Sequence, residues 1–133
     1  MDGDALQEIA RARAKELPAA EATHPFGPEY EVFKVIGKMF LLFTEVRGEQ
    51  IVVLKADPRD SEALRQTHPD ITPGYHMNKR HWITLEPGGE LDRDLIRELV
   101  TESYLLVVEG LPRAQRPVDP GSFGARPGSA PSP

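Results

Sequence analysis

The chain has no cysteine among its 133 residues. This absence excludes disulfide bonds, zinc–thiolate sites and thiol catalysis, so a metal ion could bind only through histidine or carboxylate side chains. Long hydrophobic runs are missing too, since no segment approaches the roughly 18 apolar residues that cross a bilayer. Residues 1–4 are acidic, whereas a secretory signal begins basic and continues apolar. We therefore expect a soluble, cytoplasmic protein.

An excess of positive charge is also absent. The formal net charge is −5, which argues against a protein that coats nucleic acid without sequence preference, because such proteins need a basic face. The charge is unevenly distributed, however. Residues 24–82 hold eight acids and eight bases, while the segments on either side are net acidic. A locally basic surface could therefore form from the middle of the chain.

The chain has the length of a single domain. From residue 113 onward, proline, glycine, serine and alanine dominate and few apolar side chains are available for burial. We expect one folded domain over residues 1–112 and a disordered tail over residues 113–133.

Apolar residues at helical spacing predict an amphipathic helix over residues 3–17. A short helix is expected to begin after Asp57 as N-cap, with Pro58 in its first position, and to end at His68. The longest helix should run from near Asp92 to Gly110 and lay its apolar stripe across a sheet.

Four strands are expected between these helices, over residues 30–35, 38–46, 50–55 and 82–85. Short joints that contain glycine connect the first three, which predicts an antiparallel meander. The strands are too apolar for a sheet with one face fully in water, so helices or a partner should cover them. The expected fold class is α+β, with this sheet packed against N-terminal, middle and C-terminal helices.

Residues 71–82 contain several donors and aromatic rings and no acid. Pro73-Gly74 predicts a turn, and the side chains that follow suit an anionic or hydrogen-bonding partner. The varied donors and acceptors are Tyr75, His76, Asn78, Lys79 and His81. An equally ordinary interpretation is a turn that leads into a strand, with Trp82 in the core and the charges in water.

Cations from the predicted strands could join this segment in one positive face. The candidates are Lys34, Lys38, Lys55, Lys79 and Arg80. His24, His81 and Trp82 are possible supporting residues of the same site.

No recognised catalytic arrangement occurs in the sequence. It has no Gly-x-Ser-x-Gly elbow, no phosphate-binding glycine-rich loop that ends in Lys-Ser/Thr, and no His-Glu-x-x-His pair. His68, His76 and His81 could in principle approach a metal ion, but the segment offers no carboxylate to complete a site. We expect neither an enzyme nor a bound cofactor or metal.

Several linked motifs resemble those of the bacterial MmcQ/YjbR family over roughly residues 3–112. They lie at residues 24–27, 32–40, 54–58, 73–82 and 103–104. The resemblance implies a CyaY-like α+β fold and the family's label of double-wing DNA-binding protein. The sequence departs mildly from the family pattern at Ile36-Gly37-Lys38, where the family usually has Gly-Gly-Lys. Some CyaY-like proteins bind iron through an acidic helix, which needs a run of carboxylates. That function does not carry over, because arginines interrupt the carboxylates of the first expected helix here.

The resulting hypothesis is weak, salt-sensitive DNA binding. Phosphate contacts would come from the five cations above, and Tyr75, His76 and Asn78 would approach base or sugar edges. The alternative is a non-enzymatic module that binds a protein or a small anionic ligand, with residues 71–82 forming a pocket wall. The sequence leaves the oligomeric state open.

Overall fold

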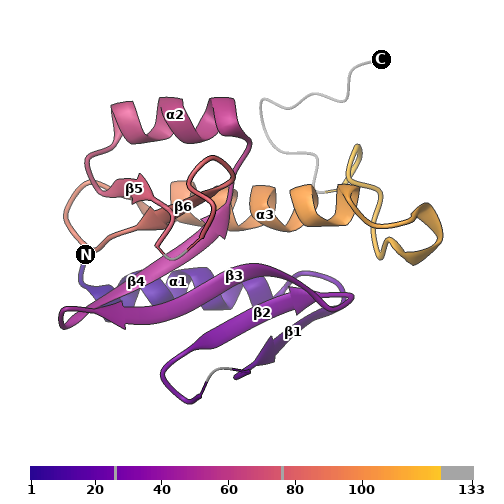
Figure 1. Cartoon of the computed structure of the whole chain (residues 1–133), viewed down its shortest axis with the longest axis horizontal. Coiled ribbons are helices and arrows are strands. Elements are labelled where there is room, and N and C mark those ends of the chain that lie inside the picture. The colour runs from indigo at the N-terminus through magenta and orange to yellow at the C-terminus, as the bar shows by residue number, and fades with distance from the viewer. Residues whose placement is uncertain (26, 76, 124–133) are drawn as a thin grey trace.

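The computed structural model describes residues 1–25, 27–75 and 77–123 (Figure 1). It has an α+β fold in which three helices pack with one antiparallel sheet. The elements in chain order are α1 (Gly3–Lys15), β1 (Ala20–Thr23), β2 (Glu31–Val35), β3 (Lys38–Val46), β4 (Glu49–Lys55), α2 (Pro58–Thr67), β5 (Ile71–Pro73), β6 (Trp82–Leu85), α3 (Arg93–Glu109) and the 3-10 helix η1 (Arg113–Gln115).

The sheet has the strand order β1-β2-β3-β4-β6-β5, with every neighbouring pair antiparallel. The expected meander of β2, β3 and β4 is confirmed. Two-residue turns at Ile36-Gly37 and Arg47-Gly48 connect its strands, and all four residues have positive φ. Such turns match the natural twist of a hairpin. The short strands β1 and β5, which sequence patterns do not predict, form the two edges.

Aspartates fix the start of each α-helix. The carboxylates of Asp2, Asp57 and Asp92 accept hydrogen bonds from backbone N–H groups in the first turns of α1, α2 and α3. α1 ends at Lys15, two residues before the expected boundary, and a tighter turn follows it in which Leu17 N donates to Ala14 O. Within the described residues, no helix is both long and apolar enough to cross a membrane.

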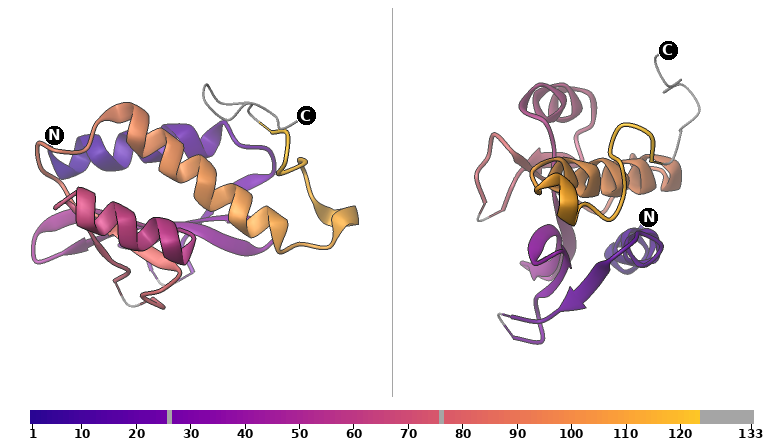
Figure 2. Two further views of the ribbon diagram at one scale, coloured as in Figure 1. Left: turned by 90° about the horizontal axis from the view of Figure 1, so that it is seen from above. Right: turned by 90° about the vertical axis from the view of Figure 1, so that its right-hand side faces the viewer.

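The main core lies between the sheet and the two helices α1 and α3 (Figure 2). A β-bulge in β3 enlarges the apolar surface that faces it. Phe33 pairs with Leu41 and Lys34 pairs with Met39, so Phe40 is an extra residue in the strand. As a result Phe40 and Leu41, although consecutive, both belong to the main core.

The opposite face of the sheet carries a smaller apolar cluster, which we call the outer cluster. Its buried members are Val32, Leu42, Ile51 and Val53. Partly buried side chains pack on it, among them Tyr75, Met77 and Trp82. The strands are thus covered on this face too, but by Tyr75 and Met77 before β6 and by Trp82 at its start rather than by the helix or partner expected.

Residues 113–123 differ from the disordered tail expected from composition. Val118 and Phe123 pack against the main core, and the ring centroid of Phe123 lies 6.0 Å from that of Tyr104. Arg116 adds polar contacts, because its guanidinium donates to the carbonyl oxygens of Glu109 and Leu111 at the end of α3. A few anchoring side chains thus order a segment of low apolar content. The remainder of the expected tail, residues 124–133, lies outside the described residues.

The Tyr104 side chain should make stability fall at alkaline pH. Tyr104 is fully buried and its hydroxyl donates to Pro18 O at 2.6 Å, while burial raises the pKa of its phenol to about 12. Between roughly pH 10 and 12 the unfolded chain loses this proton and the folded chain keeps it, so the free energy of unfolding drops by up to about 1.4 kcal/mol per pH unit.

Tyr104→Phe is expected to make this alkaline slope shallower and to cost about 1 kcal/mol at neutral pH through the lost hydrogen bond. Urea denaturation from pH 7 to 11.5 measures both effects. An unchanged slope in the variant would mean that other groups cause the alkaline loss.

Candidate functional site

Backbone hydrogen bonds join the two ends of the connection from Gly74 to Trp82, called here the 74–82 loop. Gly74 N donates to Trp82 O at 3.0 Å, and Trp82 N donates to Asn78 O at 3.0 Å. The hydroxyl of Thr84 accepts from Tyr75 N at 2.9 Å and donates to Pro73 O at 3.0 Å. The loop is therefore fastened to β5 and β6 at both of its ends.

Two of the expected binding side chains stabilise this loop from within. Lys79 Nζ donates to Gly74 O at 3.1 Å, and the side-chain oxygen of Asn78 accepts from Arg80 N at 2.9 Å. Tyr75 and Trp82 pack on the outer cluster. The motif thus has a clear structural role, and its exposed cations Lys79 and Arg80 remain at the surface. His76 lies outside the described residues.

Strand register brings the expected cations to one end of the sheet. Val35 pairs with Lys38, and Lys55 pairs with Trp82, so the end of β2, the start of β3, the end of β4 and the start of β6 lie at the same end. Lys55 Nζ lies 5.9 Å from the centroid of the Trp82 ring. α2 begins three residues after Lys55 and adds Arg59. We call this region the basic end, comprising Lys34, Lys38, Lys55, Arg59, Lys79 and Arg80.

The other end of the sheet is acidic. Glu31 begins β2, Glu45 and Glu49 flank the β3–β4 turn, and Glu86 follows β6. Two cations offset part of this charge: Arg11 from α1 pairs with Glu31 at 2.8 Å, and Arg47 lies in the β3–β4 turn. The charge of the sheet is therefore polarised along its strands, a pattern that the net charge of −5 for the whole chain does not reveal.

In the part of the chain that the structure describes, none of the six cations of the basic end forms an ion pair with a carboxylate. Acids do occur nearby, since Glu21 pairs in register with Lys34 and Asp57 begins α2. The carboxylate of Asp57 is engaged with the backbone of Arg59. The basic end thus retains donors for an external anion.

Sequence patterns miss two cations of α2, Arg59 within the basic end and Arg65 beside it. Together with the 74–82 loop they surround an open depression of about 310 Å³. Its lining residues are Pro58, Arg59, Glu62, Arg65, Lys79 and Arg80. In the sequence, Arg59 and Arg65 look like ordinary surface residues of a helix, and nothing places them beside the 74–82 loop. The one available signal was the N-cap at Asp57, which starts α2 directly after the strand that ends with Lys55.

The structure separates His24 from this region. His24 lines a depression of about 400 Å³ at the acidic end, together with Glu29, Glu31 and Glu45. His81 is exposed, and its carbonyl oxygen accepts from Ala56 N at 2.9 Å. Among the described residues, no group of three histidine or carboxylate side chains is arranged to hold a metal ion.

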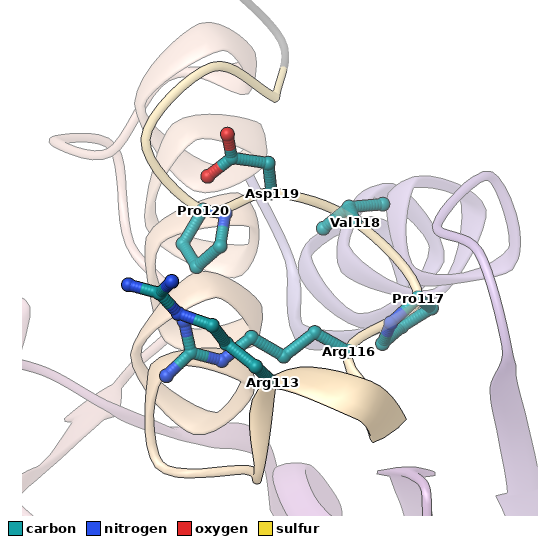
Figure 3. A pocket seen from close by; sticks show the side chains of 6 residues that line it. All are labelled: Arg113, Arg116, Pro117, Val118, Asp119 and Pro120. Carbon is teal, nitrogen blue, oxygen red and sulfur yellow. The ribbon is translucent and has the colours of Figure 1, made fainter.

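Two further depressions have mixed linings. One of about 580 Å³ lies over the outer cluster and includes both Arg47 and Lys79 and both Glu49 and Glu86. The other, of about 550 Å³, lies beside the end of α3 and is shown in Figure 3. It includes Arg113, Arg116 and Asp119. Because Arg116 already donates to two carbonyl oxygens of the chain, this second depression has mainly a structural explanation.

Comparisons with known proteins agree with this architecture. The YjbR family model matches residues 15–106. The uncharacterized protein YbdF of Escherichia coli O157:H7 is 49% identical over 122 residues, which cover 91% of this chain and 100% of YbdF. The uncharacterized protein YjbR of Escherichia coli K12 is 40% identical over 83 residues, covering 62% of this chain and 70% of YjbR.

Solved structures extend the similarity to the fold. The crystal structure of Deinococcus radiodurans protein DR2400, with domain DUF419, has a TM-score of 0.76 at 38% identity and covers 87% of this chain and 91% of its own. A Pseudomonas syringae crystal structure has a TM-score of 0.62 at 31% identity, covering 75% of this chain and 95% of its own. On this sequence and structural similarity, the chain belongs to the YjbR family.

Proposed function

We propose that this YjbR-family protein binds DNA weakly through the basic end of its sheet. The observation that supports the proposal is the grouping of six cations from β2, β3, β4, α2 and the 74–82 loop, without an ion-pairing carboxylate among the described residues. Acids gather at the opposite end, so the field of the protein would orient a polyanion toward the basic end.

Weak binding follows from the small number of contacts. Each phosphate that a cation neutralises contributes about −0.9 to the slope of log affinity against log salt concentration. Lys79 gives one donor to Gly74 O, and the net charge of −5 opposes the approach of DNA. The affinity should therefore come from a few phosphate contacts and fall steeply as salt is added.

The test removes two cations that lie away from α2. Lys34→Ala/Lys38→Ala is expected to weaken binding of a fluorescently labelled duplex by about tenfold at low salt and to reduce the salt slope by about 2. Fluorescence anisotropy at low and near-physiological salt measures both quantities. Single-stranded DNA in a parallel titration shows which form is preferred.

The matched control is Lys15→Ala/Arg93→Ala, which removes the same charge from exposed positions on α1 and α3. This control should keep most of the affinity, because α1 and α3 pack on the main-core face of the sheet, whereas the 74–82 loop packs on the outer cluster. Equal losses of DNA affinity in the two variants would mean that binding depends on net charge alone. Absence of binding at any salt would leave the alternative, a non-enzymatic module for a protein or small anion.

A further inference from the structure

The depression between α2 and the 74–82 loop brings together cations from two elements of the chain. We call it the α2 cup, and its charged lining residues are Arg59, Glu62, Arg65, Lys79 and Arg80. α2 lies beside the loop in both Figure 1 and Figure 2. Four cations and one carboxylate therefore line a depression of about 310 Å³.

Backbone contacts hold two of these cations while leaving donors unused. Arg65 Nε donates to Ser61 O at 3.3 Å, and this bond leaves the two terminal nitrogens of the guanidinium as donors for a ligand. Lys79 Nζ donates to Gly74 O at 3.1 Å and has two further protons. Positions fixed before a ligand arrives reduce the entropy that binding would cost.

The other two cations, Arg59 and Arg80, are exposed on opposite sides of the cup, one on α2 and one on the loop. No side-chain hydrogen bond or ion pair to either guanidinium occurs within the described residues. A guanidinium presents paired N–H donors that match two oxygens of a phosphate. Like charges this close also repel one another, and a bound dianion would relieve that repulsion.

We propose that the α2 cup is a binding site for a phosphate group. The site extends beyond the general attraction of DNA to the basic end, because a single phosphate dianion should bind there without a polymer. The phosphate could belong to a nucleic acid or to a small phosphorylated molecule, since both present the same oxygens.

The test titrates inorganic phosphate at constant ionic strength, with chloride as the replaced anion. Binding is followed by the NMR signal of the Arg65 Nε–H group and by the melting temperature, which a ligand of the folded state raises. Saturable shifts of the Arg65 signal together with a phosphate-dependent rise in melting temperature are expected. Absence of saturation, or equal shifts with chloride, would overturn the proposal.

Arg59→Ala/Arg80→Ala is the decisive variant, because both side chains are exposed and neither guanidinium forms a hydrogen bond or an ion pair within the described residues. It should retain the melting temperature measured without phosphate and raise the dissociation constant for phosphate at least tenfold. Lys15→Ala/Arg93→Ala removes the same charge elsewhere and should bind phosphate as the original chain does. Equal weakening in both variants would also overturn the proposal.

Competition with DNA separates the two sources of the phosphate and the two proposals. Displacement of phosphate by a short duplex would identify the cup as part of the DNA-binding surface. If no DNA binds while phosphate still saturates the cup, the DNA proposal fails and the cup remains a site for a small phosphorylated ligand.

Discussion

Replacing Ser103 by alanine is expected to lower the free energy of unfolding by about 2–4 kcal/mol. Ser103 is fully buried on α3, where its hydroxyl accepts from Lys55 N at 2.8 Å and donates to Phe40 O at 2.6 Å. The paired register of β3 and β4 ends at Leu41 and Leu54, one residue before this point. The hydroxyl thus bridges the two strands beside the bulge, and its removal takes one hydrogen-bond partner from Lys55 N and one from Phe40 O.

Ser61→Ala is the matched control. Ser61 is as fully buried as Ser103, but its hydroxyl has no hydrogen-bond partner in the described part of the chain. Alanine there removes an unsatisfied polar atom from a helix and should leave stability unchanged or raise it slightly. Urea denaturation of both variants measures the difference. Similar losses at the two serines would show that the bridge between β3 and β4 contributes little.

Sequence patterns predict the interior of the fold well because the strongest signals are local. Glycine turns at Gly37 and Gly48 separate the apolar runs of β2, β3 and β4, and Asp57 and Asp92 mark the starts of α2 and α3. The edge strands carry no comparable signal. β1 is four residues long with no fully buried side chain, and β5 is three residues long and ends in Pro73. Their pairing depends on the strands they join, which a local pattern cannot reveal.

The candidate site was predictable in part for the same reason. Lys34, Lys38 and Lys55 could be assigned to strand ends, and an antiparallel meander places those ends together. The hydrogen bond from Lys79 to Gly74 depends on the path of the loop backbone, which residue types do not specify. The contribution of Arg65 depends on how α2 packs, so it too requires the tertiary structure.

The 74–82 loop therefore combines two roles. Its apolar side chains cover the outer cluster, and its cations lie beside those of α2. A substitution that disturbs the loop, such as removal of the Lys79 hydrogen bond to Gly74 O, should consequently change stability and the basic end together. Removal of an exposed cation that makes no such bond should change only the basic end. This distinction decides which variants can test binding, and it argues against Lys79→Ala as a first choice.

Gly74→Ala is expected to lower the free energy of unfolding by about 2–3 kcal/mol. A Cβ atom at Gly74 would lie 2.7 Å from Trp82 Cβ and 2.8 Å from Trp82 O. Backbone and Cβ atoms cannot move aside as a flexible side-chain end can, so the two ends of the 74–82 loop must separate. That movement would strain the hydrogen bond from Gly74 N to Trp82 O and loosen the cover of the outer cluster. Fluorescence of Trp82, the single tryptophan of the chain, follows both the unfolding transition and the local change.

Gly89→Ala supplies the control, because a Cβ atom there would meet no atom within 4 Å. Its stability should stay within about 0.5 kcal/mol of the original chain. If Gly74→Ala also weakens phosphate binding in the α2 cup, the close contact between Gly74 and Trp82 is what positions Lys79 and Arg80 beside α2. A Gly74→Ala variant as stable as Gly89→Ala, with unchanged Trp82 emission, would show that the loop tolerates the added methyl group and that its shape does not depend on this contact.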